Sequence, residues 1–98
     1  MSLGAGLGAI NSDALADDQT VYTGAALLWG AVLTAGADVA TLILYDNTAK
    51  SGVKLIQLSA VANTTARVTL AQPILVTTGI EAAITGTAPF AFAYYNPR

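Results

Sequence analysis

The 98-residue chain contains neither cysteine nor histidine. The absence of cysteine excludes disulfides, thiolate nucleophiles and thiolate metal ligands. The absence of histidine removes the side chain that most often acts as a general base near neutral pH. Together, the two absences leave few ways in which this chain could carry out nucleophilic or acid–base catalysis.

The side chains that remain form no recognisable catalytic group. No serine has a histidine to activate it. Ser51 stands between Lys50 and Lys54, but the segment around it has the polar composition of a turn. The acids beyond residue 18 are Asp38, Asp46 and Glu81. The two aspartates stand in segments typical of turns, where aspartate bonds to nearby backbone. We therefore predict no catalytic residue and expect that the protein is not an enzyme.

Ligands for a metal ion or a nucleotide are equally sparse. Asp13, Asp17 and Asp18, or Asp46 with Asn47, offer oxygen atoms of the kind that calcium binds, but neither group has the spacing of a known calcium loop. The glycines at positions 4, 6 and 8 lack the spacing and the preceding strand of a nucleotide-binding loop. We predict no metal and no cofactor.

Charge is also scarce. Charged residues make up 10% of the chain, whereas an ordinary soluble domain has about 25%. The net charge is −2, and the four basic residues are scattered, which argues against nucleic acid as a partner. The longest apolar run, residues 24–37, is shorter than the roughly 20 residues that span a membrane. The N-terminus lacks the basic region of a signal peptide, so we expect synthesis in the cytoplasm and no membrane partner.

Apolar residues, by contrast, are abundant at 54% of the chain. A free monomer with so few charges would expose large apolar areas, and such areas usually mark interfaces. The segments 25–33 and 39–45 are apolar on both faces of the expected strands, although a two-layer sandwich buries only one face of each sheet. We therefore predict that the chain associates with copies of itself, as a trimer by analogy with other small jelly-roll modules.

The pattern beyond residue 18 is that of short strands. Thr, Val, Ile, Leu and Tyr dominate, and turn residues recur about every 8–12 positions. The predicted strands are 19–23, 25–34, 39–45, 53–59, 65–70, 74–77, 80–85 and 90–95. We predict an all-β, antiparallel, jelly-roll-like sandwich over residues 19–98, preceded by an extended arm over residues 1–18. Helices over 24–37 and 59–66 are the rival interpretation, which the density of Thr, Val and Gly disfavours.

The alternation within the strands predicts which side chains face inwards. In segment 39–45, Leu42 and Leu44 share one face. In segment 25–34, Trp29 shares a face with Leu33, and Gly30 in mid-strand indicates a bulge or a close backbone approach.

The aromatic residues admit two uses. We expect Trp29 and the stripe of Phe90, Phe92 and Tyr94 to fill the core, because they alternate regularly with small residues. The alternative is an exposed platform for carbohydrate, formed by Trp29 with Tyr94 or Tyr95.

Four segments resemble small β-sandwich structural proteins of tailed phages and prophages: residues 21–30 (VYTGAALLWG), 42–47 (LILYDN), 80–88 (IEAAITGTA) and 92–95 (FAYY). The resemblance covers roughly residues 20–95 and supplies no catalytic residue. It implies a bacteriophage virion component, such as a capsid cement (decoration) protein or a head or tail accessory protein. The major capsid protein or another virion protein would then be its partner.

The residues that we expect at interfaces come from the arm and from the strands. They are Leu3, Leu7, Ile10, Leu15, Trp29, Ile43, Tyr45 and Tyr95. The alternative function is a module that binds carbohydrate or a host surface, as part of a tail or fibre.

Overall fold

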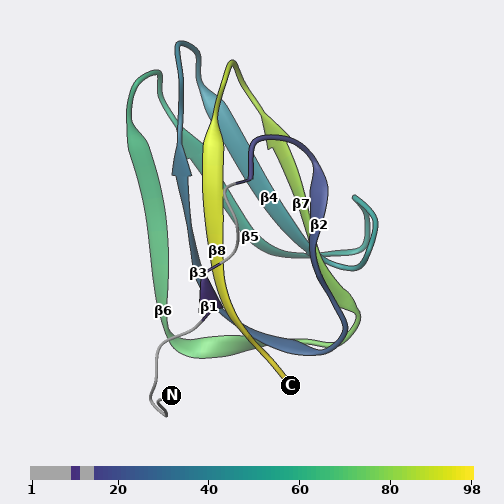
Figure 1. Ribbon diagram of the computed structural model, residues 1–98. Helices are drawn as coiled ribbons and strands as arrows, with labels where there is room; N and C mark the ends of the chain where they lie inside the picture. The colour runs from purple at the N-terminus through teal and green to yellow at the C-terminus, as the bar shows by residue number, and fades with distance from the viewer. Residues whose placement is uncertain (1–9, 12–14) are drawn as a thin grey trace.

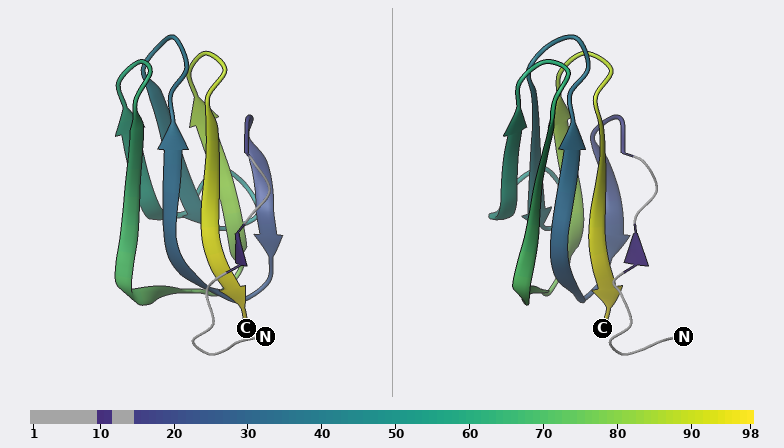
Figure 2. Two further views of the ribbon diagram at one scale, coloured as in Figure 1. Left: turned by 60° about the vertical axis from the view of Figure 1, so that its left-hand side comes forward. Right: turned by 90° about the vertical axis from the view of Figure 1, so that its left-hand side faces the viewer.

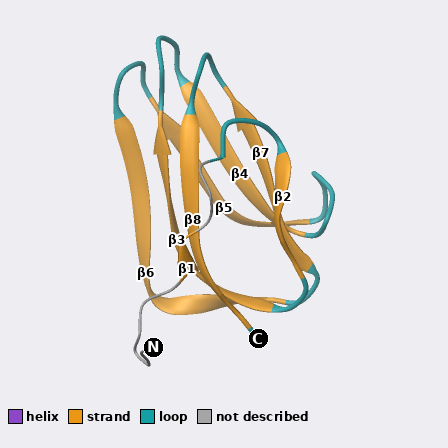
Figure 3. Cartoon of the chain, viewed as in Figure 1, coloured by secondary structure: helices purple, strands orange, loops and turns teal. Residues whose placement is uncertain are grey.

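The computed structural model describes residues 10–11 and 15–98 of the chain (Figure 1). These residues form strands and no helix (Figure 3). The strands are β1 (Ile10–Asn11), β2 (Gln19–Thr23), β3 (Ala26–Thr34), β4 (Ala40–Asp46), β5 (Val53–Ala60), β6 (Thr65–Val76), β7 (Gly79–Thr85) and β8 (Phe90–Pro97). Within this part of the chain, no helix is long and apolar enough to cross a membrane.

The strands form two four-stranded antiparallel sheets, with the orders β1-β8-β3-β6 and β2-β7-β4-β5. Figure 2 shows the two sheets as layers packed face to face. The first strand pairs with the last, the second with the seventh, the third with the sixth and the fourth with the fifth. One long hairpin rolled up on itself gives this order, which is the connectivity of a jelly roll. The predicted antiparallel sandwich is confirmed.

The core lies between the two sheets and is built mainly of leucine, isoleucine and alanine. Leu42 and Leu44 of β4 are fully buried, as the alternation predicts, and they face Leu28 and Leu33 of β3 across the sandwich, which are also fully buried. Ile80 of β7 completes this group. Each sheet therefore turns one face inwards and leaves the other outside.

A bulge in β3 changes which of its side chains face inwards. The pairing of β3 with both neighbouring strands shifts between Leu28 and Gly30, and relative to β8 Trp29 is the extra residue. Leu28 before the bulge and Leu33 after it both face the core, whereas Trp29 faces outwards. The prediction that Trp29 shares a face with Leu33 is therefore wrong, because simple alternation does not continue through a bulge. The bulge expected at Gly30 is confirmed.

Strand β6 joins two segments that the sequence predicts as separate strands. It continues through Pro73, which has no N–H to donate. This is tolerated because β6 is at the edge of its sheet and pairs only with β3. Residues 70–73 stand opposite Trp29 alone in the register, so the residue-by-residue pairing of β6 with β3 is interrupted at this point.

Two parts of the expected N-terminal arm belong to the sandwich. Ile10 and Asn11 pair with Tyr95 and Tyr94 of β8, and this short strand β1 was not predicted. Leu15 exchanges two backbone hydrogen bonds of 2.8 Å with Ala91, and its side chain is 1% exposed. Residues 1–9 and 12–14, which include the rest of the arm, lie outside the described residues.

Candidate binding surface

The outer side of the sheet β1-β8-β3-β6 carries a cluster of large apolar side chains, whereas Val39, Val53 and Val61 are exposed elsewhere on the sandwich. Antiparallel register places directly opposed residues on the same side of a sheet. The rows across strands β8, β3 and β6 are Phe90, Thr34 and Thr65, then Phe92, Val32 and Arg67, then Tyr94, Gly30 and Thr69. Trp29 and the opposed pair Leu27 and Leu75 follow. We call these outward residues the aromatic face.

The aromatic residues of β8 face outwards and not into the core. Phe90 is 45% exposed, and its ring packs edge-on against Phe92 with 6.2 Å between ring centroids. Ala91 and Ala93 face inwards instead and are fully buried. The prediction that Trp29, Phe90, Phe92 and Tyr94 fill the core is therefore wrong. Leucine and isoleucine from β3, β4 and β7 already fill the space between the sheets, which leaves room only for the small side chains of β8.

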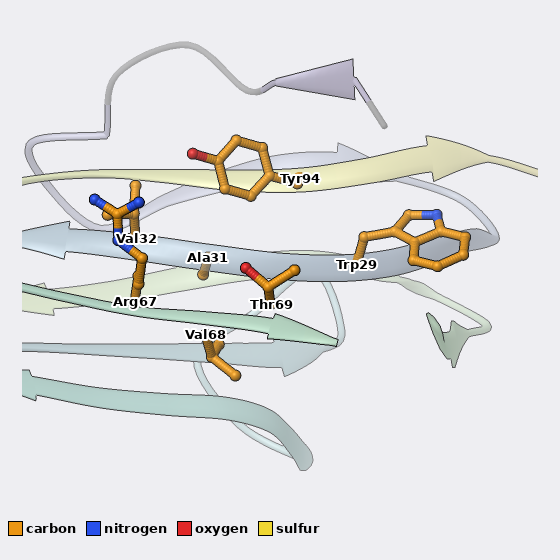
Figure 4. A pocket seen from close by; sticks show the side chains of 7 residues that line it. All are labelled: Trp29, Ala31, Val32, Arg67, Val68, Thr69 and Tyr94. Atoms are coloured by element: carbon orange, nitrogen blue, oxygen red, sulfur yellow. The ribbon is translucent and has the colours of Figure 1, made fainter. Parts of the chain in front are cut away.

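A hollow of about 310 Å³ lies in the aromatic face, where Gly30 contributes no side chain between Tyr94 and Thr69. Its lining consists of Trp29, Ala31, Val32, Arg67, Val68, Thr69 and Tyr94. Figure 4 shows Tyr94 on one side of β3 and Thr69 on the other, with Trp29 towards one end of the hollow and Arg67 towards the other.

The space beside β3 depends on glycine at position 30. A Cβ atom there would lie 2.4 Å from the Val68 carbonyl oxygen, which is too close for any other residue unless the strands move apart. This is the close backbone approach expected from the sequence.

The polar groups around the hollow have no partners within the described residues. Arg67, Thr69 and Tyr94 make no side-chain hydrogen bond or ion pair there, and the indole N–H of Trp29 is covered and has no acceptor. Arg67 carries the only charge among the described side chains of the aromatic face. Sequence analysis missed Arg67, although a single charge in a strand of Thr, Val and Leu was a usable signal.

The outer side of the second sheet is more polar. Ile43 and Tyr45 of β4 are half-buried there, and their cross-strand neighbours on β5 are Gln57 and Lys54. Hydroxyl pairing also occurs on this side, between Thr41 and Thr85. This surface is therefore less suited to an apolar contact than the aromatic face.

The expected interface residues do not form one surface. Trp29 lies on the aromatic face, whereas Ile43 and Tyr45 lie on the opposite side of the sandwich. Tyr95 points inwards and packs against Tyr22, with 5.4 Å between ring centroids, and Leu15 is in the core. These two residues are already used inside their own chain. Leu3 and Leu7 lie outside the described residues, and only the backbone pairing of Ile10 is described.

The aspartates hold loops and strand ends. Asp46 accepts hydrogen bonds from the N–H groups of Thr77 and Thr78, at 3.2 and 2.9 Å, and from the Thr77 hydroxyl. Partial burial acts to raise the pKa of Asp46, but the hydrogen bonds from Thr78 and Thr77 outweigh it and leave this pKa below its ordinary value. Asp46 thus ties the end of β4 to the turn between β6 and β7.

Asp18 forms a second link of this kind. Its carboxylate lies 2.6 Å from Lys50 Nζ and accepts a hydrogen bond of 2.7 Å from the Ile84 N–H. The hydrogen bond from Lys50, followed by that from Ile84, lowers the pKa of Asp18, and Asp18 in turn raises the pKa of Lys50. Among the described residues, no three acidic side chains lie together in a way that could hold a metal ion.

Comparisons with family models, with curated proteins and with solved structures found no match to this chain. The aromatic face and its hollow are therefore the features from which a function can be argued.

Proposed function

We propose that this chain is a structural protein of a bacteriophage virion, of the capsid cement or decoration type, which attaches to other virion proteins through the aromatic face. The protein acts by contact and not by catalysis. It is expected to form a homotrimer and to bind the major capsid protein or a neighbouring virion protein.

The aromatic face is the observation that carries this proposal. Phe90, Phe92, Tyr94 and Trp29 lie beside one another in the register of β8 and β3, with Val32 among them and Arg67 as the only charge on the described part of the face. Contiguous apolar surface of this kind is typical of protein interfaces, whose centres are rich in aromatic residues and poor in charge. The resemblance of residues 20–95 to phage structural proteins gives the proposed setting.

Attachment can be tested with phage particles assembled without this protein. Purified protein is added, and binding is measured by co-sedimentation over a range of concentrations. Phe92→Glu places a charge in the middle of the aromatic face and is expected to weaken binding at least tenfold, because a partner would have to bury that charge. Gln57→Glu places the same charge on the outer side of the opposite sheet, at an exposed position, and is the matched control, expected to bind as the unmodified protein does.

Equal binding by both variants would refute attachment through the aromatic face, and no binding by the unmodified protein would refute the virion role. Circular dichroism melting of each variant checks that the sandwich is intact. Mass photometry of the free protein tests the trimer, and a monodisperse monomer would contradict that part of the proposal.

A further inference from the structure

We infer that the hollow between Trp29 and Tyr94 is a binding site for an acidic saccharide, in which the aromatic side chains contact a sugar ring and Arg67 binds its carboxylate. This inference does not rest on the virion proposal. It assigns a small ligand to the hollow. Because Trp29, Tyr94 and Arg67 also belong to the proposed attachment surface, the saccharide binds protein that is not attached through this face.

The shape of the hollow fits a ligand of one or two rings. Its volume of about 310 Å³ is at the lower end of the range for small-molecule sites, which is roughly 300–1,000 Å³. The outward side chains of the lining include the rings of Trp29 and Tyr94 and the aliphatic Val32, so a ligand can present an apolar surface to them. The C–H groups on one side of a pyranose ring provide such a surface.

The polar groups of the lining can form hydrogen bonds with a ligand as well. Arg67, Thr69 and Tyr94 have none within the described residues, whereas several other outward polar side chains pair with each other, such as Thr41 with Thr85. A sugar carries hydroxyl groups around the rim of its ring, which can donate to and accept from Thr69 and Tyr94 while the ring itself contacts the aromatic groups.

The charge of Arg67 selects the class of sugar. No acidic side chain forms an ion pair with Arg67 in the described chain, and no other charge lies on the described part of the aromatic face. A guanidinium binds a carboxylate through two parallel hydrogen bonds. A uronic or sialic acid unit supplies the ring, the hydroxyl groups and the carboxylate together. An acidic peptide supplies the carboxylate without the ring, and we favour the saccharide because the lining is aromatic.

The only tryptophan of the chain provides the assay, because Trp29 lines the hollow. The purified protein is titrated with oligomers of galacturonate, mannuronate and sialic acid, and with neutral galactose and mannose oligomers of the same length, while tryptophan fluorescence is recorded. At least one acidic oligomer is expected to give a saturable change and to bind at least tenfold more tightly than its neutral counterpart.

Two variants test the role of Arg67. Arg67→Gln is expected to weaken binding of the acidic oligomer about tenfold and to leave binding of the neutral oligomer unchanged. Lys54→Gln removes a cation from the outer side of the opposite sheet and is the matched control, expected to bind as the unmodified protein does.

Three outcomes would overturn the inference. They are the absence of a saturable response to every acidic oligomer, equal affinity for acidic and neutral oligomers, and binding of pentaglutamate as tight as that of the best saccharide. The last outcome would assign the hollow to an acidic peptide. Particle co-sedimentation contains no added sugar and the fluorescence titration contains no particles, so failure of either proposal is seen separately.

Discussion

Replacing Gly30 with alanine should destabilise the sandwich although the change adds a single methyl group. The backbone at Gly30 does not have the positive φ that favours glycine, so the cost is one of space alone. The added Cβ would lie 2.4 Å from the Val68 carbonyl oxygen, and ordinary contact begins at 3.4 Å, so β3 and β6 must separate by about 1 Å. Such a movement disturbs the hydrogen bonds on both sides of the bulge.

The size of the effect follows from two opposing contributions. Forcing extra volume into a packed site costs about 1–3 kcal/mol. Alanine lowers the conformational entropy of the unfolded chain relative to glycine, and this offsets about 0.4–1 kcal/mol of the packing cost. The net loss should be about 1–2 kcal/mol, out of the 5–15 kcal/mol typical of a domain. For a domain of this size, that corresponds to a decrease of about 4–16 °C in the melting temperature.

Urea unfolding, followed by far-ultraviolet circular dichroism, measures this loss. Gly52→Ala is a useful comparison, because φ is 98° at Gly52 and the nearest atom to an added Cβ is 3.3 Å away. Its cost arises from backbone strain in an exposed loop and should be about 1 kcal/mol. If Gly30→Ala were as stable as the unmodified protein, the close approach of β3 to β6 would be refuted, together with the explanation of why position 30 is glycine.

Two further predictions concern Leu15, which attaches the N-terminal segment to β8, and Asp46, which attaches the end of β4 to the turn between β6 and β7. Leu15→Ala removes a fully buried side chain and should cost about 2–4 kcal/mol in urea unfolding, and a loss below 0.5 kcal/mol would place Leu15 outside the core. The pKa of Asp46 is lowered in the folded state, so its contribution to stability is complete above its unfolded pKa of about 4 and disappears as the pH falls through the folded value. Asp46→Asn should therefore lower the free energy of unfolding at pH 7 by about 1 kcal/mol, a value that allows for the partial exposure of Asp46. The variant should also lose less stability than the unmodified protein as the pH falls below 4. If both proteins lost stability equally over that range, the prediction would be contradicted.

The elements that could be predicted are those in which local pattern and tertiary packing agree. Strand β2 has the predicted ends, and Leu42 and Leu44 face the core as their alternation requires. Turn residues mark the ends of both segments, and in β4 the two leucines share one side, whereas the other side carries Thr41 and Tyr45 beside Ile43. Period-two alternation then determines both the strand and its orientation.

The errors occur where alternation does not decide the orientation. In β8, large aromatic residues alternate with alanine, and either set could face inwards on pattern alone. The choice depends on how much space the leucines of the other strands leave, which is a property of the assembled core. In β3, the bulge at Trp29 reverses the alternation, so a prediction that is right before the bulge is wrong after it.

The candidate site could be predicted only in part, because the local pattern does not show which strands pair or in which register. Trp29 and Tyr94 are paired in the alternative carbohydrate interpretation, and the structure does place both at one hollow. Arg67 joins them only through the pairing of β6 with β3, and the register of that pair depends on the bulge. The strand pattern of residues 65–70 predicts that Arg67 faces away from the core. It does not indicate which outward residues on other strands are its neighbours.

The position of the aromatic residues bears on why the chain has them. A buried aromatic side chain contributes 150–250 Å² of apolar area, among the largest contributions available to a small core. This chain instead uses leucine, isoleucine and alanine for its core and places Trp29, Phe90, Phe92 and Tyr94 on the outside of one sheet. Phe90 is 45% exposed and Trp29, Phe92 and Tyr94 are half-buried, so part of that apolar area is uncovered in the isolated chain. A partner that covers the aromatic face would bury this remaining area, which is the physical basis of the proposed attachment.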